Sequence, residues 1–317
     1  MEQQVPQTLH AAIKYFSDPE VCRQHLAQLR WPDGVTCPHC GAGNPHWMDS
    51  VKRWKCYNKE CRKQFSVKVG TIFEDSPIGL DKWLTALWII VNAKNGTSSL
   101  EISRAIGVTQ KTAWFMGHRI RLVMQNGSIC KLSGEVEVDE TLIGGKLRNM
   151  HPGRKAMAKG RTNDGKVIVM GLLERKGNVR TKVIEDAKKD TLQPLVKKHV
   201  EEGAAVFTDA LPSYNGLDAD FVHEVINHAE CYVRGHVHTN SIENFWSLFK
   251  RCIHGTYVSV EPFHLFRYLD EEGFRFNERK STDGQRFTEA LSNATGKRVT
   301  YKELIGSEAG SECLSTA

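Results

Sequence analysis

The sequence predicts an α/β domain that follows a small cysteine-rich module and a helical region. Three observations lead to this prediction. Four cysteines cluster between positions 37 and 61, in a segment with few apolar residues. Apolar residues recur at helical spacing through residues 77–126. From residue 134 the apolar residues alternate with polar ones in four stretches, and helical patterns are interspersed and follow, an order typical of an α/β domain.

The composition is that of a globular protein with more than one domain. The chain has 317 residues, of which 40% are hydrophobic and 25% charged, and this length suggests two or three domains. The longest apolar run, residues 86–91, is far shorter than the roughly 20 residues of a membrane helix. The N-terminus lacks the basic start and apolar core of a secretory signal. We therefore expect a cytosolic protein.

The cysteine cluster predicts one structural zinc ion. Two pairs, one with two and one with four intervening residues, are separated by fifteen residues; they are Cys37 and Cys40, then Cys56 and Cys61. Four thiolates on two turns are the usual ligands of a closed tetrahedral zinc site, and metal binding would supply folding energy to a segment with little core. His39 and His46 are reserve ligands. The odd total of nine cysteines argues against a disulfide framework.

Positive charge is concentrated in the first part of the chain. Residues 1–130 hold 16 Lys and Arg against 10 Asp and Glu, whereas residues 131–317 hold 27 of each. A basic module on a neutral body suggests binding to a polyanion. The residues of the cysteine module that we expect to contact DNA are Lys52, Arg53 and Lys55. The interleaved aromatic residues either join this contact or pack the small core; they are Trp47, Trp54, Tyr57 and Phe65.

Residues 99–121 have the proportions of a helix-turn-helix. Gly107 separates two helical stretches, and Thr109 is a plausible N-cap of the second. If that second helix enters a major groove, the candidate base-reading residues are Gln110, Lys111, Thr112 and His118. Arg119 and Arg121 would then contact phosphates or form internal pairs. A plain helical hairpin is the alternative interpretation.

Three carboxylates are candidate metal ligands because two of them lie at the ends of predicted strands and the third lies in a predicted helix. Asp139 and Asp209 each end an apolar or alternating strand, and Glu243 lies in a helix over residues 240–253. Such carboxylates, if brought together, could hold two Mg²⁺ ions for phosphoryl transfer. Glu137 lies on the same strand face as Asp139 and could replace it, and Glu140 adjoins it on the other face.

The helix over residues 240–253 is predicted to have two distinct faces. The apolar residues expected to pack on the sheet are Ile242, Phe245, Trp246 and Phe249. Glu243, Ser247 and Lys250 are spaced by four and three residues, so they share the other face. The carboxylate is therefore expected to point toward Asp139 and Asp209.

Taken together, these motifs resemble a known family over roughly residues 15–280. The stretches that carry the resemblance are "CPHCG", "CRKQFSVKVGTIFEDS", "KTAWFMGHRIR", "VEVDETLIGGK", "VFTDALPSYNGL", "HTNSIENFWSLFKRCIHGTY" and "HLFRYLDEEGFRFNER". The combination resembles DDE transposases with a ribonuclease H-like catalytic domain. More narrowly, it resembles bacterial insertion-sequence transposases with an N-terminal zinc ribbon.

The resemblance implies a site and an activity. It implies that the catalytic acids are Asp139, Asp209 and Glu243, and that Lys250, seven residues after Glu243, contacts DNA phosphate. His238 and Asn240 stay open as contributors to the metal site. The implied cofactors are two Mg²⁺ or Mn²⁺ ions besides the zinc. The implied reaction is cleavage at the inverted-repeat ends of double-stranded DNA, followed by strand transfer to a target by a homodimer in the bacterial cytoplasm, associated with the nucleoid.

Two further stretches gain an interpretation from the resemblance. The loop over residues 144–166 is strongly basic, and we expect it to contact the DNA backbone, with Arg154 and Lys155 at its centre. Gly273 stands where the family pattern has a bulkier residue. Because glycine in a helix interior costs about 1 kcal/mol relative to alanine, Gly273 is a candidate break in the helix over residues 262–278.

The sequence thus predicts five segments. They are an N-terminal helical segment (1–34), a zinc ribbon (35–72), a helix-turn-helix-like region (73–130), a ribonuclease H-like catalytic domain (131–285) and a C-terminal tail (286–317). Two other functions compete with that of a transposase. The chain could be a catalytically inactive zinc-ribbon DNA-binding regulator, or a structure-selective nuclease of the same fold, such as a Holliday-junction resolvase.

Overall fold

The computed structural model describes residues 5–125, 130–145, 165–226 and 238–306. The chain forms two compact units, one made of Met1–Met124 with Ser281–Ala317 and the other of Gln125–Lys280. Within the described ranges, no helix is both long and apolar enough to cross a membrane. The division into five segments stays a prediction.

The second unit is built on a five-stranded mixed sheet. Its strands are β4 (Glu135–Ile143), β5 (Val167–Glu174), β6 (Val179–Ile184), β7 (Ala205–Asp209) and β8 (Val222–Ile226). Their order is β6-β5-β4-β7-β8; β5 pairs antiparallel with both β6 and β4, and β4, β7 and β8 run parallel. This is the ribonuclease H-like arrangement that the sequence predicts.

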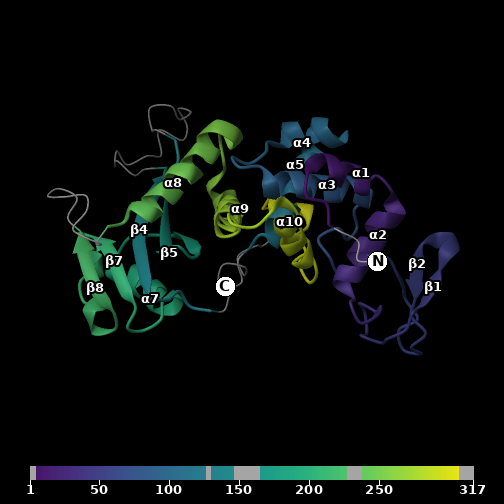
Figure 1. The fold of residues 1–317 in the computed structure, drawn as a ribbon, viewed down its shortest axis with the longest axis horizontal. Helices are drawn as coiled ribbons and strands as arrows, with labels where there is room; N and C mark the ends of the chain where they lie inside the picture. Colours follow the sequence, from purple (N-terminus) through teal and green to yellow (C-terminus); the bar gives the residue numbers. More distant parts are fainter. Residues whose placement is uncertain (1–4, 126–129, 146–164, 227–237, 307–317) are drawn as a thin grey trace. The chain divides into compact units, whose positions relative to one another are not determined.

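Helices cover the two faces of this sheet (Figure 1). Val136 and Val138 point to the face covered by α7 (Lys189–His199), where they join one apolar cluster. Residues of the opposite face pack against α8 (Asn240–Cys252) and α9 (Leu265–Asn277) in a second cluster. Because strand side chains alternate, Glu137 and Asp139 share the face of α8.

Helix α8 is amphipathic in the predicted way. Ile242, Phe245 and Phe249 have no exposed surface and Trp246 has 3%. Glu243 is exposed on the other side of the helix. The prediction that the four apolar residues face the sheet is confirmed. Beyond Cys252 the chain continues as a short π-helical stretch, Ile253–Tyr257.

The first unit combines a ribbon of short strands with a group of helices. The strands are β1 (His46–Met48), β2 (Arg53–Lys55) and β3 (Gln64–Phe65), in that order and antiparallel. The helices are α1 (Leu9–Tyr15), α2 (Pro19–Arg30), α3 (Leu80–Asn92), α4 (Ser99–Ile106), α5 (Gln110–Val123), α10 (Asp283–Ser292) and α11 (Tyr301–Leu304).

Helix α10 has no counterpart in the sequence prediction, which places a tail from residue 286. A capping box starts the helix, since Thr282 and Gln285 exchange side-chain and backbone hydrogen bonds. Phe287 is fully buried, with its ring 5.1 Å from Trp88 of α3 and 5.2 Å from Phe16. The helix therefore completes the core of the first unit. The contact between Phe287 and Trp88 joins residues nearly 200 positions apart, so no local sequence pattern predicts it.

The expected break at Gly273 is wrong. Helix α9 runs through this residue without interruption from Leu265 to Asn277. Both of its neighbours, Glu272 and Phe274, are buried. Packing on both sides thus outweighs the weak helix propensity of one glycine.

Candidate active site and zinc centre

Asp139 and Asp209 lie on neighbouring parallel strands. Glu137 of β4 is in register with Phe207 of β7, so two residues further along, Asp139 and Asp209 reach the same level of the sheet. Asp209 is the last residue of β7. Asp139 is in the middle of β4, not at its end as predicted, because the strand continues to Ile143 by pairing with β5.

The Asp139 carboxylate is half-buried and strongly influenced by its neighbours. The indole N–H of Trp246 donates a hydrogen bond to Oδ2 at 3.0 Å. Burial and then the negative charge of Asp209 raise the pKa of Asp139 to about 6, and the charge of Glu243 acts in the same direction. The three predicted acids are therefore close enough to interact electrostatically.

Asp209 and Glu243 are each oriented by a local contact. The Oδ1 atom of Asp209 accepts a hydrogen bond from the backbone N–H of Leu211 at 3.1 Å. The Oε1 atom of Glu243 accepts one from the Thr239 hydroxyl at 3.0 Å. Asp209 is half-buried, as Asp139 is, whereas Glu243 is exposed.

The three carboxylates form a looser group than a bound metal would require. Within the described ranges, the four ribbon cysteines are the one group of three or more potential ligands whose atoms all lie within 4.8 Å of one another. The oxygen atoms of the three carboxylates are nevertheless the ligand type that Mg²⁺ and Mn²⁺ prefer, and the donor set fits such ions.

Glu137 has a different role from the one left open by the sequence. It has no exposed surface, and its Oε2 accepts hydrogen bonds from the backbone N–H groups of Ser241 at 2.8 Å and Ile242 at 3.0 Å. Its Oε1 accepts from Arg175 Nε at 2.8 Å. Thr239, the N-cap residue of α8, makes no capping hydrogen bond with its side chain. Glu137 thus caps α8, and both of its oxygens are engaged in contacts with the protein.

Glu140, the other alternative, lies on the opposite strand face. Its Oε1 accepts a hydrogen bond from the hydroxyl of buried Tyr214. Burial, with a smaller contribution from the charges of Asp139 and Asp209, raises the pKa of Glu140 to about 8. It is therefore a mostly neutral, hydrogen-bonded residue at neutral pH and a poor metal ligand.

His238 contacts Glu137 and Arg175. Its Nδ1 lies 3.3 Å from Glu137 Oε1, and its carbonyl oxygen accepts from Arg175 Nη2 at 2.8 Å. Asn240 is the exposed first residue of α8. Lys250 is half-buried on the same helix, seven residues after Glu243, a spacing that nearly completes two turns.

The four ribbon cysteines come together as the sequence predicts. The Sγ atoms of Cys37 and Cys61 are 3.8 Å apart and those of Cys40 and Cys56 are 3.6 Å apart. A tetrahedral zinc with Zn–S bonds of about 2.3 Å requires sulfur separations of about 3.8 Å. The backbone N–H of Ala42 lowers the pKa of the Cys40 thiol to about 7, whereas burial raises the pKa of the Cys56 thiol to about 12. Metal binding would therefore have to displace protons from the cluster. The residues fit a structural zinc ion, and the reserve ligands His39 and His46 are not part of the cluster.

We expect the purified chain to contain one zinc ion, and the Cys56→Ser variant to lose it. The ribbon has little core beyond the metal, so zinc loss should unfold this module. Zinc content by mass spectrometry and protease sensitivity near residues 37–61 measure both effects. Cys22→Ser is a matched control, since Cys22 is buried in α2 outside the cluster. A folded ribbon without zinc would contradict the assignment.

The ribbon exposes basic residues and buries two of its four aromatic residues. Lys52 and Arg53 are exposed, Lys55 is half-buried, and Lys52 pairs with Asp49 at 2.7 Å. Trp54 and Phe65 are 5% and 1% exposed and stack on each other, whereas Tyr57 is 64% exposed. The interpretation that the aromatic residues pack a small core therefore holds for Trp54 and Phe65.

Helices α4 and α5 form the predicted pair around Gly107, whose φ of 64° ends α4 in the left-handed conformation. Thr109 caps α5 by accepting from the backbone N–H of Thr112, as expected. Gln110 and Lys111 are exposed and Thr112 is half-buried. His118 has no exposed surface and cannot reach a DNA groove in this structure, which corrects its assignment as a base-reading residue. The His118 side chain lies on the face of α5 that packs into the core.

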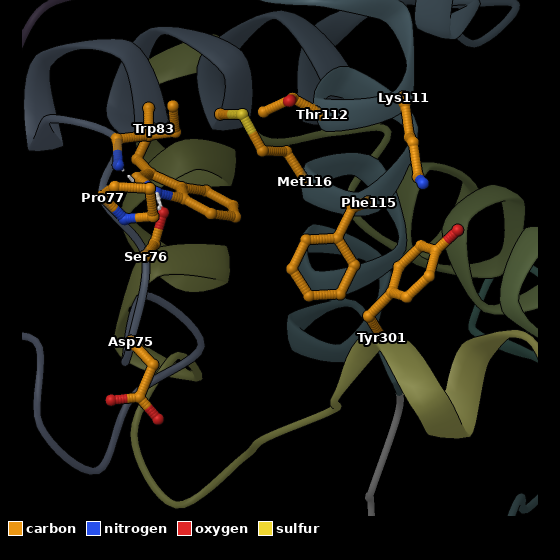
Figure 2. A pocket seen from close by; sticks show the side chains of 10 residues that line it. Asp75, Ser76, Pro77, Trp83, Lys111, Thr112, Phe115, Met116 and Tyr301 are labelled. Carbon is orange, nitrogen blue, oxygen red and sulfur yellow. Dashed lines mark hydrogen bonds between the residues drawn. The ribbon is translucent and has the colours of Figure 1, made fainter. Parts of the chain in front are cut away.

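The exposed start of α5 also borders a small apolar pocket of about 290 Å³. Figure 2 shows Lys111, Phe115 and Tyr301 at one side of it. The Nζ of Lys111 lies 4.9 Å from the centre of the Tyr301 ring, and Phe115 packs edge-on against the same ring. Arg119 is buried; its Nη2 donates to the carbonyl of Glu74, so it serves an internal contact.

The remaining predicted DNA contacts, Arg154 and Lys155, lie outside the described residues. Sequence reasoning missed two roles that the structure reveals. Glu137 caps α8 from a strand, and Trp246 donates to Asp139. Both contacts join residues more than 100 positions apart. The one available signal is the placement of an indole three residues after Glu243, on the adjacent helical face.

Comparison with known proteins finds two domain families in this chain. The model of the ISXO2-like transposase domain matches residues 131–277, and that of the transposase zinc-ribbon domain matches residues 17–64. The chain belongs to the insertion-sequence transposase family that these two domains define.

Two relatives and one solved structure illustrate the similarity. An uncharacterized protein in transposable element ISH50 of Halobacterium salinarum is 29% identical over 254 residues, which cover 76% of this chain and 85% of the relative. An uncharacterized transposase-like protein of Haemophilus influenzae is 34% identical over 103 residues, covering 32% and 83%. The crystal structure of the Mos1 strand transfer complex aligns over 66% of this chain and 73% of that chain, with 13% identity and a TM-score of 0.28.

Proposed function

We propose that this transposase binds the inverted-repeat ends of an insertion sequence and catalyses metal-dependent DNA cleavage and strand transfer. One observation carries the proposal. Three acids from β4, β7 and α8 lie on one side of a ribonuclease H-like sheet, and the negative charges of Asp209 and Glu243 both raise the pKa of Asp139. A cluster of negative charge of this kind is stabilised by divalent cations.

The acids of the cluster have separate tasks in this proposal. Asp139, Asp209 and Glu243 would hold two Mg²⁺ or Mn²⁺ ions. Such ions, when bound, activate the attacking oxygen and stabilise the leaving 3′-oxygen of an in-line phosphoryl displacement. Lys250, on the same helix as Glu243, would bind a DNA phosphate next to the acids.

DNA recognition is assigned to the first unit. The exposed first turn of α5, with Gln110, Lys111 and Thr112, is the part of a recognition helix that usually reaches base edges. The exposed basic residues Lys52 and Arg53 of the ribbon would add contacts to the phosphate backbone. Joining two ends of one element calls for two active sites, so we propose that the protein acts as a homodimer on DNA.

An assay with labelled DNA ends tests the function. We expect the zinc-loaded protein to nick DNA at the inverted repeats that flank its own gene, to leave 3′-hydroxyl groups, and to join them to a target plasmid when Mg²⁺ is present. DNA with scrambled ends and reactions without Mg²⁺ are the controls. Specific binding without cleavage would indicate an inactive regulator. Cleavage of four-way junctions without preference for these ends would indicate a structure-selective nuclease.

A further inference from the structure

The strand position opposite Asp139 is a glycine, and a larger residue there would collide with side chains of α8. Gly171 of β5 pairs with Asp139 of β4. A Cβ atom on Gly171 would lie 2.5 Å from Cζ2 of Trp246 and 2.8 Å from Cδ1 of Ile242. The backbone of Gly171 does not adopt a positive φ. Its missing side chain is therefore needed to let the indole of Trp246 approach the sheet, a use of glycine known from strands that another group approaches closely.

The indole spans the two strands at this point. Its ring lies over Gly171 on β5, while its N–H donates to Oδ2 of Asp139 on β4 at 3.0 Å. Trp246 is 3% exposed and packs within the apolar cluster between α8 and the sheet. A buried indole N–H normally finds an acceptor, and here the acceptor is the predicted catalytic carboxylate.

The hydrogen bond fixes the orientation of that carboxylate. The backbone N–H of Glu140 also donates to Asp139, so both the strand and the helix hold the group. Trp246 follows Glu243 by three residues on α8. One rigid helix thus carries an acid of the site and a donor that orients a second acid on the sheet. Partners of this kind set the direction in which a ligand oxygen faces the metal.

We propose that Trp246 is a positioning residue for catalysis, which holds Asp139 through its indole N–H in the space that Gly171 leaves open. The inference rests on the proposed function, since it concerns the same acids. The apolar face of α8 would then orient a catalytic carboxylate in addition to packing on the sheet. Loss of the N–H alone, without loss of an aromatic ring, should weaken metal binding at the acids.

The test compares two conservative variants of the full zinc-loaded chain. Trp246→Phe keeps an aromatic side chain but removes the donor, while Phe249→Leu reduces the same apolar face without touching Asp139. We expect Trp246→Phe to bind Mn²⁺ about tenfold more weakly in a titration followed by electron paramagnetic resonance without DNA. Phe249→Leu should stay within about twofold of the wild type. Equal Mn²⁺ affinity of Trp246→Phe and wild type would overturn the positioning role.

A spectroscopic measurement separates this outcome from failure of the proposed function. The indole N–H resonance that disappears in Trp246→Phe identifies Trp246 in a ¹⁵N-labelled sample. In the wild type, this resonance should shift when Asp139 is replaced by alanine and broaden on addition of Mn²⁺. If Mn²⁺ leaves it unchanged in the wild type, the metal site itself is wrong, and the inference falls with it. If it broadens but Trp246→Phe keeps wild-type affinity, only the positioning role is wrong.

Discussion

Replacing Asp209 by asparagine is expected to reduce cleavage of the DNA ends by about a thousandfold or more. Asp209 ends β7 at the level of Asp139 and contributes to the raised pKa of Asp139. Asparagine keeps the size and can still accept from the Leu211 N–H, but it removes the negative charge that would bind a divalent ion. A thousandfold loss corresponds to about 4 kcal/mol of transition-state stabilisation. The rate of nicking in Mg²⁺ measures the effect.

The matched control is Asp218→Asn, since Asp218 is a carboxylate of the same unit whose side chain is 77% exposed. This variant should cleave at the wild-type rate. Both variants should bind the DNA ends as the wild type does, because the proposed recognition residues lie in the first unit. Cleavage by Asp209→Asn at the wild-type rate would remove Asp209 from the active site.

The second large effect is expected from Glu137→Ala. Glu137 has no exposed surface; it caps α8 through two backbone N–H groups and pairs with Arg175. Its removal leaves these N–H groups and a largely buried guanidinium without their main acceptor. Breaking a buried pair of this kind typically costs about 3–5 kcal/mol of folding free energy. We expect this loss in urea unfolding, together with reduced cleavage, since α8 also carries Glu243.

Glu135→Ala provides the comparison, because Glu135 contacts the same Arg175 at 3.2 Å but its side chain is 49% exposed. An exposed pair is worth about 0–1 kcal/mol, so this variant should be nearly as stable as the wild type. Glu137→Gln, which keeps an acceptor for the N–H groups, should fall between the two. Equal stability of Glu137→Ala and Glu135→Ala would show that the capping contact contributes little.

The sequence alone predicted most of the features that depend on local pattern. Alternation placed the strands of the sheet, and 3.6-residue periodicity placed the buried face of α8 on the correct four residues. The spacing of the cysteines identified a group that the structure brings together. Thr109 was recognisable as a cap because capping is a contact over three residues.

Features that depend on distant contacts could not be predicted in this way. His118 belongs to a helix with an exposed first turn, and only packing shows that its side chain is buried. Helix α10 was missed because its reason for folding is a contact of Phe287 with Trp88 and Phe16. The weak helix propensity of Gly273 predicts a break in α9, because propensity depends on the residue alone. Burial of the surrounding residues keeps the helix continuous.

The sequence by itself predicted a group of four cysteines with the spacing of zinc ligands, a pair of helices around Gly107, and three acids on strands and a helix. The tertiary structure decided which contacts each of three neighbouring carboxylates makes. Glu137, Asp139 and Glu140 are close in sequence and chemically alike, yet one caps α8, one receives the indole N–H of Trp246, and one binds Tyr214 on the opposite face. The physical reason is that strand alternation sets the face of each carboxylate, but its protonation and its partners depend on what packs against that face.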